Sequence, residues 1–81
     1  MIVMVDHMSP VPLYEQLADL LAARIESGEL APGAPLPSES YLQQEHGLSR
    51  VTVRAAMRAL RERGLVVTLP QRGTYVRDSS G

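Results

Sequence analysis

Arginine recurs at helical spacing along one stretch of the chain. The stretch contains Arg50, Arg54, Arg58 and Arg61. At about 100° per residue these four side chains fall on one stripe less than about 100° wide. Because arginine forks onto a phosphate, or onto O6 and N7 of guanine, such a stripe is typical of a surface that binds nucleic acid. A solvated basic helix face is the alternative interpretation, although such faces more often mix charges of both signs.

The net charge of −1 hides an uneven distribution. Residues 1–48 carry one arginine and seven acidic residues, whereas residues 49–77 carry seven arginines and one acidic residue. Charges more than about 10 Å apart are screened at moderate salt, so the local field rather than the total charge governs binding to a polyanion. The basic half of the chain is therefore the half expected to face nucleic acid.

The chain offers little for catalysis, metal binding or membrane insertion. It has no cysteine, and its two histidines, His7 and His46, have no partners at the spacing of a zinc site or of a nucleophilic triad. Its glycines are scattered singly, unlike a phosphate-binding loop. No apolar run approaches the roughly 20 residues that cross a bilayer. We expect no enzymatic activity, cofactor, metal or membrane contact, and a soluble cytoplasmic protein.

Three helices and a hairpin are expected to position the arginines. Apolar residues at helical spacing predict helices over about residues 12–27, 39–46 and 50–63. β-branched and apolar residues predict strands over about 65–69 and 74–77. The order short helix, turn and longer helix is a helix-turn-helix pattern. Because a two-stranded hairpin is only marginally stable alone, the hairpin is expected to pack against the last helix. The expected fold is mostly α with a small β-hairpin, a winged helix-turn-helix.

The rest of the chain is expected to be connectors and ends. Residues 1–11 carry no clear pattern and are expected to form a flexible segment before a domain over residues 12–77. The proline-rich connector between the first two helices has room only for a brief strand around Pro35 and Leu36. Residues 78–81 read as a polar tail.

The helix expected over residues 50–63 has the two faces that a recognition helix needs. Its apolar face, which should pack on the other helices, adjoins the arginine stripe and consists of Val53, Ala56, Met57 and Leu60. The amino-terminal end of such a helix reads bases, so Arg50, with Arg54 one turn later, is a candidate for guanine. Arg58 and Arg61 are candidates for phosphate contacts, or are simply solvated.

Serine, threonine and the hairpin turn add further candidates. Ser49 is a candidate helix cap, and its hydroxyl cannot fully serve both a cap and a phosphate. Thr52 lies near 200° on the helical wheel, off the stripe, and reaches a base only if the helix enters the groove end-first. Arg72 in the hairpin turn could enter a minor groove, whereas Gly73 is explained at least as well by turn geometry.

These motifs together resemble the amino-terminal winged-helix domain of GntR-type bacterial transcription regulators. The resemblance covers residues 12–76 and rests on the ordered motifs LPSE, LSRVTVRAAMRAL, RGLV and RGTYV. It implies a domain of three helices and a β-wing. It also implies DNA contacts at Ser38, Ser49, Arg50, Thr52, Arg54, Arg72, Gly73 and Thr74. The chain departs from many members at Ser40, where arginine is common, and at Gln71, where glycine is common.

The resemblance further implies a second, carboxy-terminal domain that binds an effector and dimerises. The 81 residues contain no such domain, so we expect an isolated domain that is largely monomeric. The full-length protein is expected to be a homodimer on a pseudo-palindromic operator in double-stranded DNA. A winged helix that grips a protein partner is the alternative. The arginine stripe counts against it, because the centres of protein interfaces favour apolar and aromatic residues.

Overall fold

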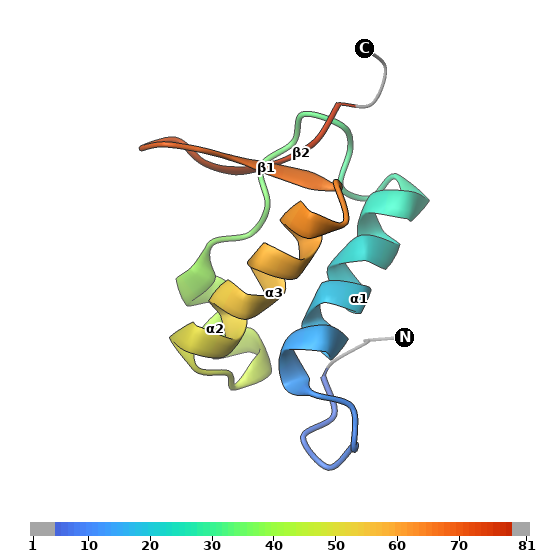
Figure 1. Cartoon of the computed structure of the whole chain (residues 1–81), viewed down its shortest axis with the longest axis vertical. Coiled ribbons are helices and arrows are strands. Elements are labelled where there is room, and N and C mark those ends of the chain that lie inside the picture. The colour runs from blue at the N-terminus through green and yellow to red at the C-terminus, as the bar shows by residue number, and fades with distance from the viewer. Residues whose placement is uncertain (1–4, 79–81) are drawn as a thin grey trace.

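The computed structural model describes residues 5–78, which form three helices followed by a two-stranded antiparallel hairpin (Figure 1). The helices are α1 (Leu13–Ser27), α2 (Glu39–His46) and α3 (Arg50–Glu62). The strands are β1 (Val66–Leu69) and β2 (Gly73–Val76). This arrangement confirms the expected winged helix-turn-helix. The expected bounds of α2 are reproduced, those of α1, α3 and β1 differ by one residue at one end, and β2 begins and ends one residue earlier than expected.

Local capping explains where the helices begin and end. Pro12 precedes the first residue of α1, and Gly28 ends this helix in the left-handed conformation with φ of 88°. The hydroxyl of Ser38 accepts a hydrogen bond from the backbone N–H of Tyr41 at 3.1 Å, which caps α2. Gly47 then ends α2 with φ of 63°, and this turn brings α3 across α2.

The two strands of the hairpin pair with each other, and β2 also pairs with the connector before α2 at a single β-bridge. β1 and β2 pair from Val66 opposite Val76 to Leu69 opposite Gly73. The connector before α2 adds a bridge between Pro35 and Tyr75. Two hydrogen bonds flank this bridge: Leu36 N–H donates to Thr74 O at 2.9 Å, and Val76 N–H donates to Ala34 O at 2.8 Å. Where the sequence leaves room for a brief strand around Pro35 and Leu36, the structure has an isolated β-bridge, and this bridge with its hydrogen bonds connects the hairpin to the rest of the domain.

The core is aliphatic and lies between the helices and the base of the hairpin. Its largest fully buried side chains are Leu17, Leu21, Leu42, Val53 and Leu60. α3 packs on α1, α2 and β1, so the apolar face of this helix is fixed against the rest of the domain. No helix in the part of the chain that the structure describes is both long and apolar enough to span a membrane.

Residues 5–11 pack on the domain, although the sequence showed no pattern there. Val5 is buried in the core cluster. The backbone N–H of Asp6 donates to Oε1 of Gln16 in α1 at 2.7 Å, and Nε2 of His7 lies 2.9 Å from the carbonyl oxygen of His46 in α2. The proposed flexibility of residues 1–11 stays a prediction, and residues 1–4 lie outside the described residues.

Candidate nucleic-acid interface

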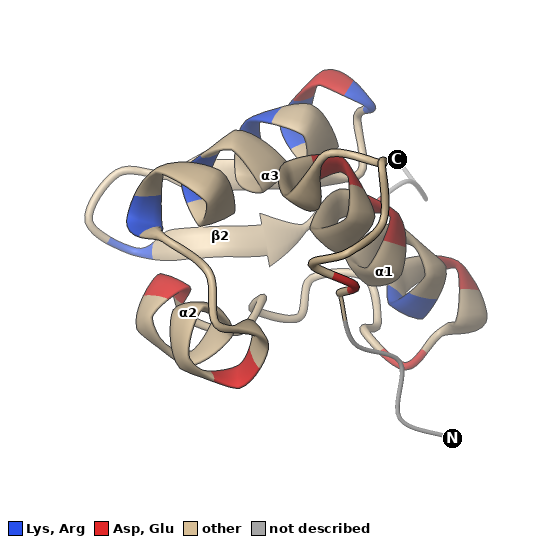
Figure 2. Cartoon of the chain, turned by 90° about the horizontal axis from the view of Figure 1, so that it is seen from below, with Lys and Arg blue, Asp and Glu red and all other residues tan. Residues whose placement is uncertain are grey.

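The arginines of α3 face away from the core. Val53, Ala56, Met57 and Leu60 are buried. The side chains of Arg50, Arg54, Arg58 and Arg61 are exposed. Figure 2 shows the basic residues gathered on α3 and at the hairpin turn, whereas acidic residues dominate α1 and the ends of α2. The charge separation of the sequence therefore becomes a separation between faces, which places a positive field over α3 and the hairpin.

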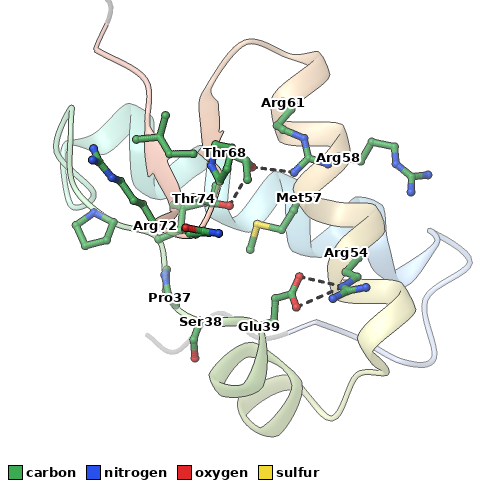
Figure 3. A pocket seen from close by; sticks show the side chains of 16 residues that line it. Pro37, Ser38, Glu39, Arg54, Met57, Arg58, Arg61, Thr68, Arg72 and Thr74 are labelled. Carbon is green, nitrogen blue, oxygen red and sulfur yellow. Dashed lines mark hydrogen bonds and ion pairs between the residues drawn. The ribbon is translucent and has the colours of Figure 1, made fainter.

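A groove of about 660 Å³ lies between α3, the beginning of α2 and the hairpin (Figure 3). Seven of the predicted site residues line it: Ser38, Arg54, Arg58, Arg61, Arg72, Gly73 and Thr74. They come from three separate segments of the chain, so the fold brings them together. In Figure 3 the side chain of Arg58 extends away from the hairpin, and that of Arg61 points toward it.

Arg54 is held by an acidic partner on α2. Its Nε lies 3.3 Å from Oε2 and 3.4 Å from Oε1 of Glu39, and both side chains stay about half exposed. An exposed pair of this kind contributes little to stability, because solvent screens it. Its effect is on orientation: the pair occupies Nε and leaves the outer guanidinium nitrogens available to a ligand.

Arg61 connects α3 to the hairpin. Its Nη1 donates to Oγ1 of Thr68 in β1 at 3.0 Å, and Thr68 Oγ1 lies 3.1 Å from Oγ1 of Thr74 in β2 (Figure 3). One arginine and two hydroxyl groups thus form a continuous polar wall on one side of the groove. Arg61 consequently has a structural contact in addition to the phosphate contact that the sequence favours.

The remaining predicted residues lie at the beginning of α3, beside the groove. Ser49 caps the helix: its Oγ accepts from the N–H of Thr52 at 3.2 Å and donates to Oγ1 of Thr52 at 2.9 Å. The expected cap is confirmed, and in this arrangement the hydroxyl hydrogen of Ser49 is already used. Arg50, next in the chain, is exposed. Of these three residues, Arg50 lies on the arginine-bearing face, and Ser49 and Thr52 lie beside it at the same end of the helix.

The tip of the hairpin is a defined turn. The hydroxyl of Tyr75 donates to the carbonyl oxygen of Arg72 at 2.9 Å, and the N–H of Arg72 donates to Leu69 O at 3.0 Å. Gln71 takes a positive φ of 63° and Gly73 a φ of 112°. The position at which the sequence departs from glycine is therefore one where the backbone favours glycine. The side chain of Arg72 is exposed next to the groove.

One titratable group of α2 has a shifted pKa. Tyr41 is an exposed residue of α2, where the Glu45 carboxylate raises the pKa of the tyrosine, first by a hydrogen bond and second by its negative charge.

Sequence reasoning missed the partners of the arginines. No local pattern marked Glu39 or Thr68 as the partner of an arginine. Arg63, which is not part of the arginine stripe, forms an ion pair with Asp19 of α1 at 2.9 Å. The partners lie 7 to 44 residues away in the chain, and local periodicity does not identify them.

Comparison with known proteins places the chain in a family. The family described as "Bacterial regulatory proteins, gntR family" matches residues 13–76. The mannosyl-D-glycerate transport/metabolism system repressor MngR of Escherichia coli is 49% identical over 71 residues, covering 88% of this chain and 30% of that protein. The HTH-type transcriptional repressor NagR of Bacillus subtilis is 43% identical over 72 residues, covering 89% of this chain and 30% of that protein. The chain thus spans less than a third of the length of these relatives.

Solved structures agree with the sequence comparison. The GntR-family transcription factor YtrA from Sulfolobus acidocaldarius superimposes with a TM-score of 0.87 at 34% identity, covering 98% of this chain and 83% of that one. AraR(DBD) in complex with operator ORR3 superimposes with a TM-score of 0.80 at 29% identity, covering 94% and 92% of the two chains. The chain therefore belongs to the GntR family of bacterial regulatory proteins, of which it forms a winged-helix DNA-binding domain.

Proposed function

We propose that this domain reads one half of a two-fold operator, with α3 in the major groove and the hairpin toward the minor groove. The observation that carries the proposal is the arginine stripe: α3 packs its apolar face on α1 and α2 and presents Arg50, Arg54, Arg58 and Arg61 on the outside. The width of the major groove admits a single helix held in this way. The similarity to AraR(DBD), solved in complex with operator ORR3, supports binding to operator DNA.

The residues divide by their place on this face. Arg50 and Arg54, in the first two turns of α3, are assigned to base edges, with Ser49 and Thr52 beside them. Arg58, Arg61 and Ser38 are assigned to phosphates along the groove. Arg72, Gly73 and Thr74 at the hairpin are assigned to the second contact region, where an arginine enters a narrow minor groove favourably.

The role of the whole protein is proposed by analogy. The relatives named above are described as repressors, so we assign this chain to a cytoplasmic repressor without catalytic activity of its own. A further domain outside these 81 residues is proposed to dimerise the protein and to bind an effector. A two-fold dimer matches a pseudo-palindromic site, because each subunit then occupies an equivalent half.

The first test is the salt dependence of binding. Fluorescence anisotropy of this chain on a mixed pool of short duplexes, at about 50 and 200 mM salt, should show affinity falling with a slope of roughly −0.9 per phosphate contacted. Two arginine–phosphate contacts, those of Arg58 and Arg61, correspond to about a 12-fold loss over that range.

A matched variant provides the control. Arg61→Ala should reduce the magnitude of the slope by about 0.9, whereas Arg63→Ala removes the same charge from the far side of α3 and should leave the slope unchanged. A folded chain that shows no binding at the lower salt would contradict the proposal and favour a protein-interaction module instead.

A further inference from the structure

Val51 is an apolar side chain exposed on the arginine-bearing face of α3. Its exposed fraction is 78%, while Val53, Ala56, Met57 and Leu60 of the same helix are buried. Exposure alone carries no function, because single apolar residues are common on protein surfaces. The direction and the position of Val51 along the helix are what distinguish it.

Val51 points away from the core. At about 100° per residue it lies about 170° from the centre of the buried face and only about 20° from the direction of Arg58. It also lies in the first turn of α3, directly after Arg50 and three residues before Arg54. The proposed function assigns this end of the helix to base edges, so Val51 belongs to the same end of α3 as Arg50 and Arg54, at about 100° and 60° from them around the helix axis.

An apolar side chain at such a point can read only one feature of the major groove. The groove presents hydrogen-bond donors and acceptors, which valine cannot pair with, and the C5-methyl group of thymine, which it can contact. Hydrogen bonding by valine is excluded, since its side chain has no polar atom.

We propose that Val51 is a specificity-determining residue that selects a thymine, through its C5-methyl group, at one position of each half-site. The proposal rests on the proposed function, because it requires α3 to lie in the major groove. It adds a thymine to the guanines that Arg50 and Arg54 are assigned to read. The contact removes two apolar surfaces from water, which is its driving force.

The test removes the methyl group from the DNA. An operator is first selected from random duplexes with this chain, and each thymine of the half-site is then replaced singly by deoxyuridine. Deoxyuridine keeps the pairing and the polar groups of thymine and loses only the methyl. We expect one position at which the replacement raises Kd about fourfold, the effect of burying one methyl group.

The variant Val51→Ala tests whether the Val51 side chain is the group that contacts the thymine methyl at the sensitive position. In this variant thymine and deoxyuridine should bind equally at the sensitive position, while the other positions keep their behaviour. Val11→Ala is the matched control, because Val11 is an exposed valine that lies before α1 and outside α3 and the hairpin. It should retain the fourfold preference. Circular dichroism establishes that both variants fold, as expected for changes at exposed positions.

The outcomes separate the two levels of the proposal. Selection that yields no preferred duplex overturns the proposed function itself. A selected operator with no deoxyuridine-sensitive thymine overturns only the role of Val51. A sensitive thymine that stays sensitive in Val51→Ala also overturns it, because another side chain then contacts the methyl. Loss of the sensitivity in Val51→Ala and its retention in Val11→Ala support the proposal.

Discussion

At the scale of single residues, the arginines of α3 differ in what holds them. Arg50 is exposed at the beginning of the helix, Arg54 is paired with Glu39, and Arg61 is bonded to Thr68. A guanidinium whose Nε is already engaged loses less freedom when its outer nitrogens bind a base. The stripe is therefore a set of side chains with different degrees of preorganisation, and each is expected to respond differently to substitution.

The first residue-level prediction separates base reading from phosphate binding. Arg50→Ala and Arg54→Ala should each weaken binding to the selected operator by about 1–3 kcal/mol and relax base preference. Arg61→Ala should weaken cognate and random duplexes alike, because a phosphate contact is indifferent to sequence. Competition titrations on the two kinds of duplex measure the difference. An equal loss on both duplexes for Arg50→Ala would show that Arg50 does not read bases.

The second residue-level prediction concerns Glu39. Its carboxylate orients Arg54 but also places a negative charge beside the groove. Glu39→Gln should therefore strengthen binding to random duplex and lower the ratio of cognate to random affinity by up to about fivefold. Glu26→Gln, which removes an exposed carboxylate of α1, is the control and should leave the ratio unchanged. A ratio that rises in Glu39→Gln would mean that the ion pair hinders Arg54 rather than orienting it.

At the scale of elements, the hairpin is positioned by contacts at its base and at its tip. The connector before α2 forms a β-bridge with β2 through Pro35 and Tyr75, and the Arg61–Thr68–Thr74 contacts join α3 to both strands. A two-stranded hairpin is marginal by itself, so these contacts give the wing its fixed direction. The tip remains the weakest part, because Gln71 holds a left-handed conformation there.

The element-level prediction follows from the two positive φ values of the turn. Gln71→Gly should raise the free energy of unfolding by roughly 0.5–1 kcal/mol, because glycine adopts φ of 63° without steric strain. Gly73→Ala should lower it by about 1 kcal/mol or more. A Cβ at Gly73 would meet no atom within 4 Å, so the cost there comes from the backbone alone. Urea unfolding monitored by circular dichroism measures both changes. Equal stabilities for the two variants would contradict the description of the turn.

At the scale of the whole molecule, the charge asymmetry matters more than the net charge of −1. The acidic residues lie mainly on α1 and at the ends of α2, while α3 and the hairpin turn carry the basic ones (Figure 2). Such a dipolar arrangement orients the domain on approach to DNA, since the acidic side is repelled while the basic side is attracted.

The whole-molecule prediction concerns the oligomeric state. Dimerisation is assigned to a further domain outside these residues, so the 8.9 kDa chain should sediment as a monomer. On a duplex with two half-sites, two copies should bind without cooperativity. Linking two copies through a flexible linker that spans both half-sites should raise the affinity by about 10²–10⁴-fold. A tight dimer of the unlinked chain in sedimentation would contradict this expectation.

Local signals in the sequence determined most of the fold. The helical repeat of apolar residues, the caps at Ser38 and Ser49 and the glycine at residue 47 each act within about four residues, so the bounds of the helices could be predicted from neighbours alone. The same repeat separated the arginine stripe of α3 from its buried face. The fold class and the composition of the basic face therefore followed from the order of the residues.

Only the tertiary structure decided which groups meet. Glu39 and Arg54 are 15 residues apart, and Pro35 and Tyr75 meet across the domain. Val5 belongs to the core although no periodicity marks it. These contacts depend on the angles at which α1, α2 and the hairpin cross α3, and those angles are set by the packing of many side chains at once. The periodicity of one segment carries no information about them, and for this reason the groove emerged only when the elements were assembled.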